Sequence, residues 1–576
     1  MWLRICVLLL STLCVAQLSS TAPPVPRFED VSARAGLTVS HISSPDELYI
    51  IESTSGGVGF IDCDNDGKLD IITANGSTVE RYRQGGDPMV TLYHQDANLK
   101  FTDITKTAGL TRKGWGMGVA VADFDNDGWQ DLYVTGYGGN ALYRNLGNCK
   151  FEDVTEKAGL RVGGFSTGAA WGDYDRDGFV DLFVPRYVHE EINALPETHA
   201  NGAPCNYLAM RVLCGPDGLQ GESDFLFRNR GDGTFEDVSK KAGVDDPNHY
   251  FGMQGVWADY DNDGWPDLYV SNDAGPNYLY RNKHDGTFEE VGLFMGTALN
   301  SEGRMQASMG VDLGDFNHEG RLSIVVTNFT QEGADLYWNR DEQGFSEISS
   351  SAGILQPTLP YVGWGTAFVD VENSGWDDIF MANGHAYPQM ESVKGGVPYR
   401  QQVLLLRNNR NRTFTNITSL SGLNDLPLHS RRGAAFGDVN NDGKVDVLLL
   451  NLGEPPTLLI NRTLSPNHSV LFHLVGTRSN KAAIGARVKV TAGDLVQFKE
   501  VRSGSSYLSQ NDLRLHFGLG ARTKMSTVEI SWPSGRKDVL RDLAADSIYT
   551  VVEEKGIQQK TPLAKDGVNP SMAPVR

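Results

Sequence analysis

Residues 123–131 read DFDNDGWQD and place four aspartates within nine residues. Oxygen-bearing side chains stand at positions 1, 3, 5 and 9 of this stretch, and a glycine at position 6 allows a sharp bend. Ca²⁺ needs six or more oxygen ligands in a flexible shell, which this spacing can supply. Asp, Asn and Gly also form turns without any metal. The single stretch therefore leaves a calcium loop and a plain turn as alternatives.

The same nine-residue pattern occurs seven times, which favours calcium loops. Successive loops start 61, 50, 86, 56, 55 and 68 residues apart, within the range expected of repeated supersecondary units. The first four loops carry a full acidic set: Asp62, Asp64, Asp66 and Asp70; Asp123, Asp125, Asp127 and Asp131; Asp173, Asp175, Asp177 and Asp181; Asp259, Asp261, Asp263 and Asp267. The sixth and seventh loops offer Asp370, Glu372 and Asp378, and Asp438, Asn440, Asp442 and Asp446.

The fifth loop, which starts at Asp315, has lost its last carboxylate to Ser323, so we expect it to be the emptiest site. A metal site that only braces a turn can lose ligand residues without loss of the fold. The uneven loops therefore predict several Ca²⁺ ions per chain in a structural role.

Each loop is embedded in a unit of short apolar segments. An F-x-(D/E)-(V/I) segment precedes the loop and a segment of the LYRN type follows it, as at Leu142. These segments are typical of β-strands, about four to a module. The prediction is an all-β chain with a seven-bladed β-propeller over residues 21–463, and an open solenoid is the alternative. The loop, a glycine ahead of it and the F-x-D-V strand together resemble the FG-GAP or VCBS repeat over residues 28–463.

The N-terminus predicts export. Residues 1–20 have one Arg, an apolar run and small residues, as in a secretory signal peptide, and no stretch is long enough for a membrane span. We expect a secreted protein, or a periplasmic or cell-surface one in a bacterium. An oxidising compartment predicts a disulfide between Cys205 and Cys214 in the insertion at residues 185–224. Cys63 and Cys149 either pair or remain free thiols.

Two features are candidate binding elements. The insertion at residues 185–224 either carries a binding surface or covers one end of the propeller channel. The second candidate is a set of residues five positions after each loop, namely Asn75, Gly136, Arg186, Asn272, Asn328, Asn383 and Asn451. Five amides and one Arg on one face could bind a sugar; alternatively, each Asn ends its strand through an Asx turn. In the second case the sequons at Asn75 and Asn328 would accept glycans less readily than those at Asn461 and Asn467.

After residue 463 the loops stop, and residues 464–555 predict a small antiparallel β-sandwich. NKAAIGARVKV, GSSYLSQNDLRLHFGLG and VEISWPSGRKDVL in this segment resemble the ASPIC/UnbV domain. The combination resembles the cartilage acidic protein family, which implies a secreted, acidic, calcium-binding protein. Vertebrate members of this family usually add an EGF-like calcium module, and no Cys-rich segment follows residue 214 here, which argues against an animal matrix role and is compatible with a bacterial exported member. Residues 556–576 are expected to form a disordered tail.

Composition and motifs exclude several classes of function. A formal net charge of -21 argues against nucleic acid as a partner. No nucleophile, zinc or phosphate-loop motif occurs in a convincing context. We therefore expect a non-catalytic protein that binds or adheres to an extracellular protein. A glycan-binding module is the alternative, followed by an enzyme on a propeller scaffold.

Overall fold

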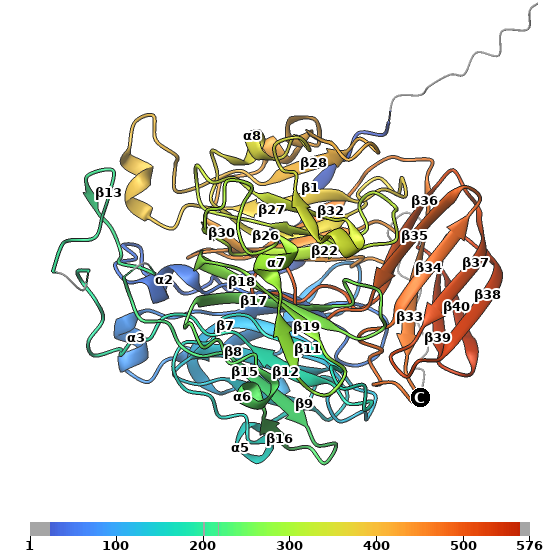
Figure 1. Ribbon diagram of the computed structural model, residues 1–576, viewed down its shortest axis with the longest axis horizontal. Helices are drawn as coiled ribbons and strands as arrows, with labels where there is room; N and C mark the ends of the chain where they lie inside the picture. The colour runs from blue at the N-terminus through green and yellow to red at the C-terminus, as the bar shows by residue number, and fades with distance from the viewer. Residues whose placement is uncertain (1–22, 200–201, 217, 565–576) are drawn as a thin grey trace, which may run out of the picture.

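The computed structural model describes residues 23–199, 202–216 and 218–564 (Figure 1). The predicted signal peptide lies outside the described residues. Within them, the chain is all-β, and its strands form seven sheets of at least four strands before residue 462 and two four-stranded sheets after it. Short helical turns connect many of the strands.

The first four sheets have antiparallel neighbours throughout. The first is β2 (Val58–Ile61), β3 (Asp70–Ala74), β5 (Val90–Gln95) and β6 (Phe101–Asp103). The second is β7 (Lys113–Ala122), β8 (Asp131–Tyr137), β9 (Ala141–Asn145) and β10 (Phe151–Asp153), with β4 (Asp87–Pro88) beside β7. The third is β11 (Ala170–Gly172), β12 (Asp181–Val184), β15 (Phe225–Asn229) and β16 (Phe235–Asp237). The fourth is β17 (Phe251–Ala258), β18 (Asp267–Gly275), β19 (Tyr278–Asn282) and β20 (Phe288–Glu290), with β21 (Gln306–Ala307) on β18.

The remaining three sheets repeat this order. The fifth is β22 (Val311–Gly314), β23 (Ser323–Val326), β24 (Asp335–Asn339) and β25 (Phe345–Glu347). The sixth is β26 (Gly363–Val369), β27 (Asp378–Asn383), β28 (Leu404–Asn408) and β29 (Phe414–Asn416). The seventh is β30 (Arg431–Gly437), β31 (Asp446–Asn451), β32 (Thr457–Asn461) and β1 (Phe28–Asp30).

In every one of these sheets the acidic loop joins the first strand to the second. The F-x-D-V segment forms the fourth strand of the sheet before it, so sequence modules and sheets are offset by one strand. At the chain start this offset puts β1 beside β32, with Phe28 opposite Asn461. The first described strand therefore completes the last of the seven sheets.

The helices are short. Five follow fourth strands: α1 (Ser32–Ala35), α4 (Thr105–Ala108), α5 (Thr155–Ala158), α6 (Ser239–Ala242) and α7 (Gly292–Met295). The others are α2 (Ile50–Thr54), α3 (Val79–Arg83), α8 (Leu355–Thr358) and the 3-10 turns η1 (Asp341–Gln343), η2 (Pro388–Ser392), η3 (Thr418–Leu420) and η4 (Leu423–Asp425). The insertion contains the two-stranded β13 (Asn206–Tyr207) and β14 (Met210–Arg211), and the predicted disulfide joins Cys205 to Cys214 beside it.

The last two sheets enclose one apolar core. They are β35 (Leu495–Glu500), β34 (Arg487–Ala492), β37 (Lys524–Ser531) and β38 (Lys537–Ala544), and β36 (Leu515–Gly520), β33 (His468–Val475), β39 (Ser547–Val552) and β40 (Gly556–Pro562). Phe472 and Phe517 of one sheet share a buried cluster with Val488 and Ile530 of the other. These sheets lie on one side of the molecule, at the right of Figure 1, and β13, α2 and α3 lie on the opposite side.

Two expectations for this segment were wrong. The segment is not purely antiparallel, because β33 and β39 run parallel. It also does not end at residue 555, because β40 pairs with β39 from Gly556 to Pro562. The sequence GIQQKTP is mostly polar because β40 is an edge strand with one neighbour, and such strands carry polar side chains toward solvent. Residues 565–576 of the predicted tail lie outside the described part.

Candidate metal sites and the surfaces around them

The first aspartate of each acidic loop braces the turn. Asp123 accepts hydrogen bonds from the backbone N–H groups of Asp127 and Gly128, at 3.0 and 2.7 Å. Asp315 of the fifth loop does the same for Glu319 and Gly320, at 2.9 and 3.2 Å. The turn geometry is therefore kept even in the loop with the poorest set of acidic residues.

The ninth-position aspartate ties the loop to its sheet. Asp131 accepts from the backbone N–H of Asn145 on the third strand at 2.7 Å and from that of Phe124 in the loop at 3.0 Å. Asp70, Asp181, Asp267 and Asp446 make the same two bonds. In the fifth loop the Ser323 hydroxyl accepts from the third strand instead, at 3.2 Å. Ninth-position oxygens are thus partly engaged in holding the loop.

The loops bring carboxylate oxygens together as a cation would require. Three clusters have their ligand atoms within 4.8 Å of one another: Asp62, Asp64 and Asp66; Asp123, Asp125 and Asp127; Asp173, Asp175 and Asp181. Burial, together with repulsion from neighbouring carboxylates, raises the pKa of Asp62, Asp123 and Asp173 to about 7 in each case. A bound divalent cation would relieve this repulsion.

Buried oxygens without a partner support the same fit. One oxygen each of Asp125, Asp173 and Asp175 is buried with no hydrogen-bond partner among the described residues. Such atoms are costly unless a ligand satisfies them. The side chains of the second and third loops therefore fit a hard cation, which would supply charge neutralisation at the turn.

Cationic side chains of the third strands face the same loops. Arg144 contacts Asp125 at 2.5 Å and Asp127 at 2.8 Å, and Arg228 contacts Asp175 and Asp177 at 2.6 and 2.8 Å. In the first loop His94 takes this place, at 3.1 Å from Asp64. Arg407 pairs with Glu372 in the sixth loop. These partners offset part of the negative charge and would compete with a weakly bound ion.

A ring of side-chain amides links the loops, and sequence reasoning missed it. The amide of Asn145 donates to the carbonyl of Gln130 in its own loop and to that of Cys63 in the preceding loop, at 3.0 and 2.9 Å. Equivalent donations to preceding loops come from Asn229, Asn282, Asn339, Asn408 and Asn461. Gln95 of the first sheet reaches Val439 in the seventh loop at 3.2 Å. The sequence feature that could have revealed this ring is the Asn that recurs in the LYRN segments.

The fourth position of the loops adds a second set of links. These residues have positive φ, as at Asn126 with φ 59°. Side-chain amides donate to the glycine carbonyl of the next loop in five cases: Asn65 to Gly128, Asn126 to Gly178, Asn262 to Gly320, Asn373 to Gly443 and Asn441 to Gly67. Neighbouring loops are therefore coupled directly, and the seventh is coupled to the first.

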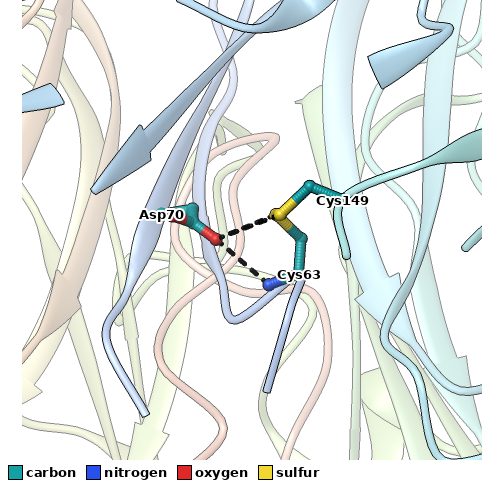
Figure 2. Close-up of side chains that lie close together, drawn as sticks. All are labelled: Cys63, Asp70 and Cys149. Atoms are coloured by element: carbon teal, nitrogen blue, oxygen red, sulfur yellow. Dashed lines mark hydrogen bonds between the residues drawn. A yellow bond between two sulfur atoms is a disulfide. The ribbon is translucent and has the colours of Figure 1, made fainter. Parts of the chain in front are cut away.

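A disulfide also joins the first loop to the second sheet. Cys63 and Cys149 are bonded, with their Cα atoms 4.8 Å apart, which resolves the open alternative in favour of the pair (Figure 2). Asp70 accepts from the Cys63 backbone N–H at 3.1 Å, and the Cys149 N–H donates to the Cys63 carbonyl at 3.1 Å. The first loop is thus fixed covalently and by hydrogen bonds.

Residues 503–512, which read SGSSYLSQND, form a plug that no sequence signal predicted. This segment leaves the C-terminal sheets and contacts the first strands of the other sheets. The contacts include Gln510 N with Val58 O, Val119 N with Leu508 O, Leu508 N with Gln254, Ser506 N with Val311 O, Thr366 N with Ser506 Oγ, and Phe436 N with Asn511. At Gly504, which has φ 79°, an added Cβ would lie 2.2 Å from the Ala169 carbonyl oxygen, so only glycine fits there.

The tip of the plug is fully buried. Tyr507 has no exposed surface and donates its hydroxyl to the Thr54 carbonyl at 2.6 Å. Its ring lies 4.8 Å from that of Trp364. The segment lies among the first strands of the seven sheets and bonds to several of them.

The C-terminal sheets cover part of the face that carries the acidic loops. Arg487 pairs with Asp259 of the fourth loop at 3.0 Å, and Lys499 pairs with Asp377 of the sixth at 2.8 Å. Arg514 donates to the Asp438 carbonyl at 2.7 Å. Partners therefore have restricted access to the loops on this face.

The residues five positions after the loops lie at the other strand ends, where they hold connecting segments. The amides of Asn75, Asn272, Asn383 and Asn451 donate to backbone carbonyls, and Asn328 donates to Gly333 and Asp335. Arg186 pairs with Glu222. All six are buried, so they present no free ring of amides. The Asn461 side chain is also wholly buried, because it belongs to the amide ring, which contradicts the expected readiness of its sequon for glycosylation.

Two protein families match separate parts of the chain. The FG-GAP-like repeat matches residues 62–134, 123–184, 212–270 and 259–326, and the ASPIC and UnbV family matches residues 476–558. Cartilage acidic protein 1 of Homo sapiens is 25% identical over 545 residues, which cover 88% of this chain and 74% of the relative. The Mus musculus protein is 23% identical over 538 residues, which cover 88% and 75%.

Two solved structures resemble the chain weakly. An Agrocybe aegerita lectin that recognises non-reducing terminal N-acetylglucosamine is 17% identical, with a TM-score of 0.37 over 64% of this chain and 82% of that chain. YCF48 bound to D1 peptide is 8% identical, with a TM-score of 0.40 over 77% and 99%. At these scores the likeness carries no argument about function. Among the described residues, none of the helices has the length and apolar character needed to cross a membrane.

Proposed function

Because the chain belongs to the family that joins FG-GAP-like repeats to a C-terminal ASPIC and UnbV domain, as in cartilage acidic protein 1, we propose that it is a secreted, non-catalytic binding protein. Ca²⁺ in the acidic loops stiffens its scaffold. The partner is an extracellular protein. The two disulfides support an extracellular location, and so does the similarity to proteins named cartilage acidic protein 1.

The seven sheets form one closed seven-bladed propeller in this proposal. The amide ring carries the argument, because each third-strand amide reaches the preceding loop and Gln95 joins the first sheet to the seventh. The pairing of β1 with β32 supports the same closure. Two four-stranded sheets with a shared core form the terminal sandwich.

The partner-binding surface lies away from the C-terminal sheets. Arg487, Lys499 and Arg514 already occupy the loop face, whereas the insertion at residues 185–224 lies on the opposite side. The glycan-binding alternative loses its strongest support, since the amides it required are bonded to backbone carbonyls.

Hydrogen exchange of the full chain in Ca²⁺ and in EDTA tests the proposal. We expect Ca²⁺ to slow exchange in residues 62–70, 123–131, 173–181 and 259–267. The fifth loop, residues 315–323, is an internal control that should change least, because it lacks the ninth-position carboxylate. If no acidic loop responds to Ca²⁺, the calcium part of the proposal fails.

A further inference from the structure

A cavity of about 180 Å³ lies on the side opposite the C-terminal sheets. Its walls come from elements far apart in the chain: α2, the end of β18, the start of β26, the segments that follow β12, β23 and β27, and the segment around β21. Leu213, Gly215 and Pro216 of the insertion also line it. The cavity therefore sits where several sheets and the insertion meet.

The cavity carries negative charge on apolar walls. Asp273 and Glu332 line it together with Met309, Trp364 and Tyr387, and no Lys, Arg or His occurs among the described lining residues. A larger cleft of about 610 Å³ beside the C-terminal sheets has side chains of both signs, so it favours no one ligand charge. The charged side chains that line the smaller cavity are all negative among the described residues.

Each of the two carboxylates keeps one oxygen unbonded. Asp273, only 8% exposed, accepts the Tyr187 hydroxyl at 2.5 Å through one oxygen. Glu332 uses one oxygen for the backbone N–H groups of Ala307 and Phe329, at 2.9 and 3.2 Å. The other oxygen of each makes no hydrogen bond to a described residue. Burial first, and then repulsion from Glu332, raises the pKa of Asp273 to about 7 although Tyr187 opposes this.

A buried guanidinium behind the Trp364 wall of the cavity is bonded elsewhere. Arg432 lies over the Trp364 ring, 4.0 Å from its centroid, and donates to the carbonyls of Ser53 and Arg431. Burial lowers the pKa of Arg432, although attraction to Glu47 opposes this. Among the described residues that line the cavity, none is a cation that Asp273 and Glu332 could share.

We propose that this cavity binds an organic ammonium group. Two carboxylates are too few oxygens for a hard metal ion, which seeks six or more, and the Met, Leu and Trp walls suit the carbon body of an amine. A cavity of about 150 Å³ accepts a benzene-sized molecule, so one of this size holds a short alkylamine or a choline head. The inference goes beyond the proposed function, because the site lies away from the acidic loops and needs no Ca²⁺.

The test is calorimetric titration of the full chain at saturating Ca²⁺. The probes are choline, its neutral isostere 3,3-dimethyl-1-butanol, butylamine, and a short peptide with one lysine. We expect at least one ammonium probe to bind about tenfold or more tightly than the neutral isostere. Binding of butylamine or choline alone identifies a free small amine as the source, whereas binding of the peptide alone identifies a protein lysine.

Variants of the two carboxylates test whether the ammonium probes bind in this cavity. Asp273→Asn and Glu332→Gln should each weaken ammonium binding about tenfold, and Asp494→Asn, which changes an exposed carboxylate on the C-terminal sheets, should not. Equal binding of the isostere, no binding of any ammonium probe, or unchanged affinity in Glu332→Gln overturns the proposal. If Asp273→Asn does not fold, the Glu332→Gln variant and the probe series on the unaltered chain still decide it. Hydrogen exchange in the acidic loops tests the calcium proposal independently, so the failure of one proposal can be told from the failure of the other.

Discussion

The side-chain amide of Gln95 donates to the backbone carbonyl of Val439 over 3.2 Å, although 344 residues separate them. The same amide also donates to Leu69 at 2.9 Å, so one side chain holds the first acidic loop and the seventh. Its equivalents on the other third strands are Asn. The ring of loops therefore closes through the one position where the longer Gln replaces Asn.

Replacing Gln95 by Met should destabilise the fold. The change keeps the shape but leaves the carbonyls of Leu69 and Val439 without this donor in a buried place, at a cost of about 2–4 kcal/mol. Gln558→Met is the matched control, because Gln558 is exposed on β40 and should change stability by less than about 0.5 kcal/mol. Urea unfolding measures both, and equal stabilities would contradict the importance of the ring.

The plug should contribute to the stability of the seven sheets. Tyr507→Ala removes a fully buried ring and should lower the free energy of unfolding by about 3–5 kcal/mol. Tyr507→Phe removes only the hydroxyl bond to Thr54 and should cost about 1–2 kcal/mol. A Tyr507→Ala variant that unfolds at the same urea concentration as the unaltered chain would show that the plug is dispensable.

The two disulfides should differ in their effect. Cys63 and Cys149 are 86 residues apart, whereas Cys205 and Cys214 are 9 apart. The longer loop restrains the unfolded chain more, so replacing both Cys63 and Cys149 by Ser should cost about 2 kcal/mol more than replacing the other pair. Thermal unfolding of the two double variants makes the comparison, and a larger loss in the Cys205 and Cys214 variant would contradict it.

Glu553 should make stability depend on pH in the acid range. Burial raises its pKa, but the Ser534 hydroxyl and the backbone N–H groups of residues 477–479 bond its carboxylate and lower the pKa from 4.5 to about 2. A lowered folded-state pKa stabilises the fold fully above pH 4.5, and this stabilisation is lost as the pH falls toward 2.

The variant Glu553→Gln isolates this effect. Because solvent screens part of the carboxylate's interactions, the variant should be less stable than the unaltered chain by about 2 kcal/mol at neutral pH, less than the full pKa shift implies, with the difference constant above pH 5 and shrinking below 4.5. Urea unfolding at several pH values measures the difference. A gap that stays constant down to pH 2.5 would show that the charge of Glu553 does not contribute.

Local patterns were enough to predict the strands and acidic loops, because ligand spacing and turn residues act within nine residues. They also carried a clue to the amide ring, since the Asn of LYRN recurs. The offset between modules and sheets was missed because β1 pairs with β32, a partner that periodicity cannot identify.

Long-range features were beyond sequence reasoning for a physical reason. The plug at residues 503–512 has no periodic pattern, because its backbone bonds to several different sheets rather than to one neighbouring strand. β40 was taken for a tail since its polar residues suit both an edge strand and a solvated segment. Likewise, the cavity beside Asp273 is assembled from residues of α2, the insertion and several sheets.

Thermal unfolding over a Ca²⁺ titration and in EDTA, with direct metal counting on the native protein, tests the calcium-stiffened propeller most directly. A ligand at 100 times its dissociation constant adds about 2.7 kcal/mol per site when it binds only the folded state. We predict a rise of many degrees in the midpoint with several bound ions per chain, and one ion fewer in Asp125→Asn. A midpoint indifferent to Ca²⁺, with no ions found, would show that the aspartates of DFDNDGWQD serve only as turn formers.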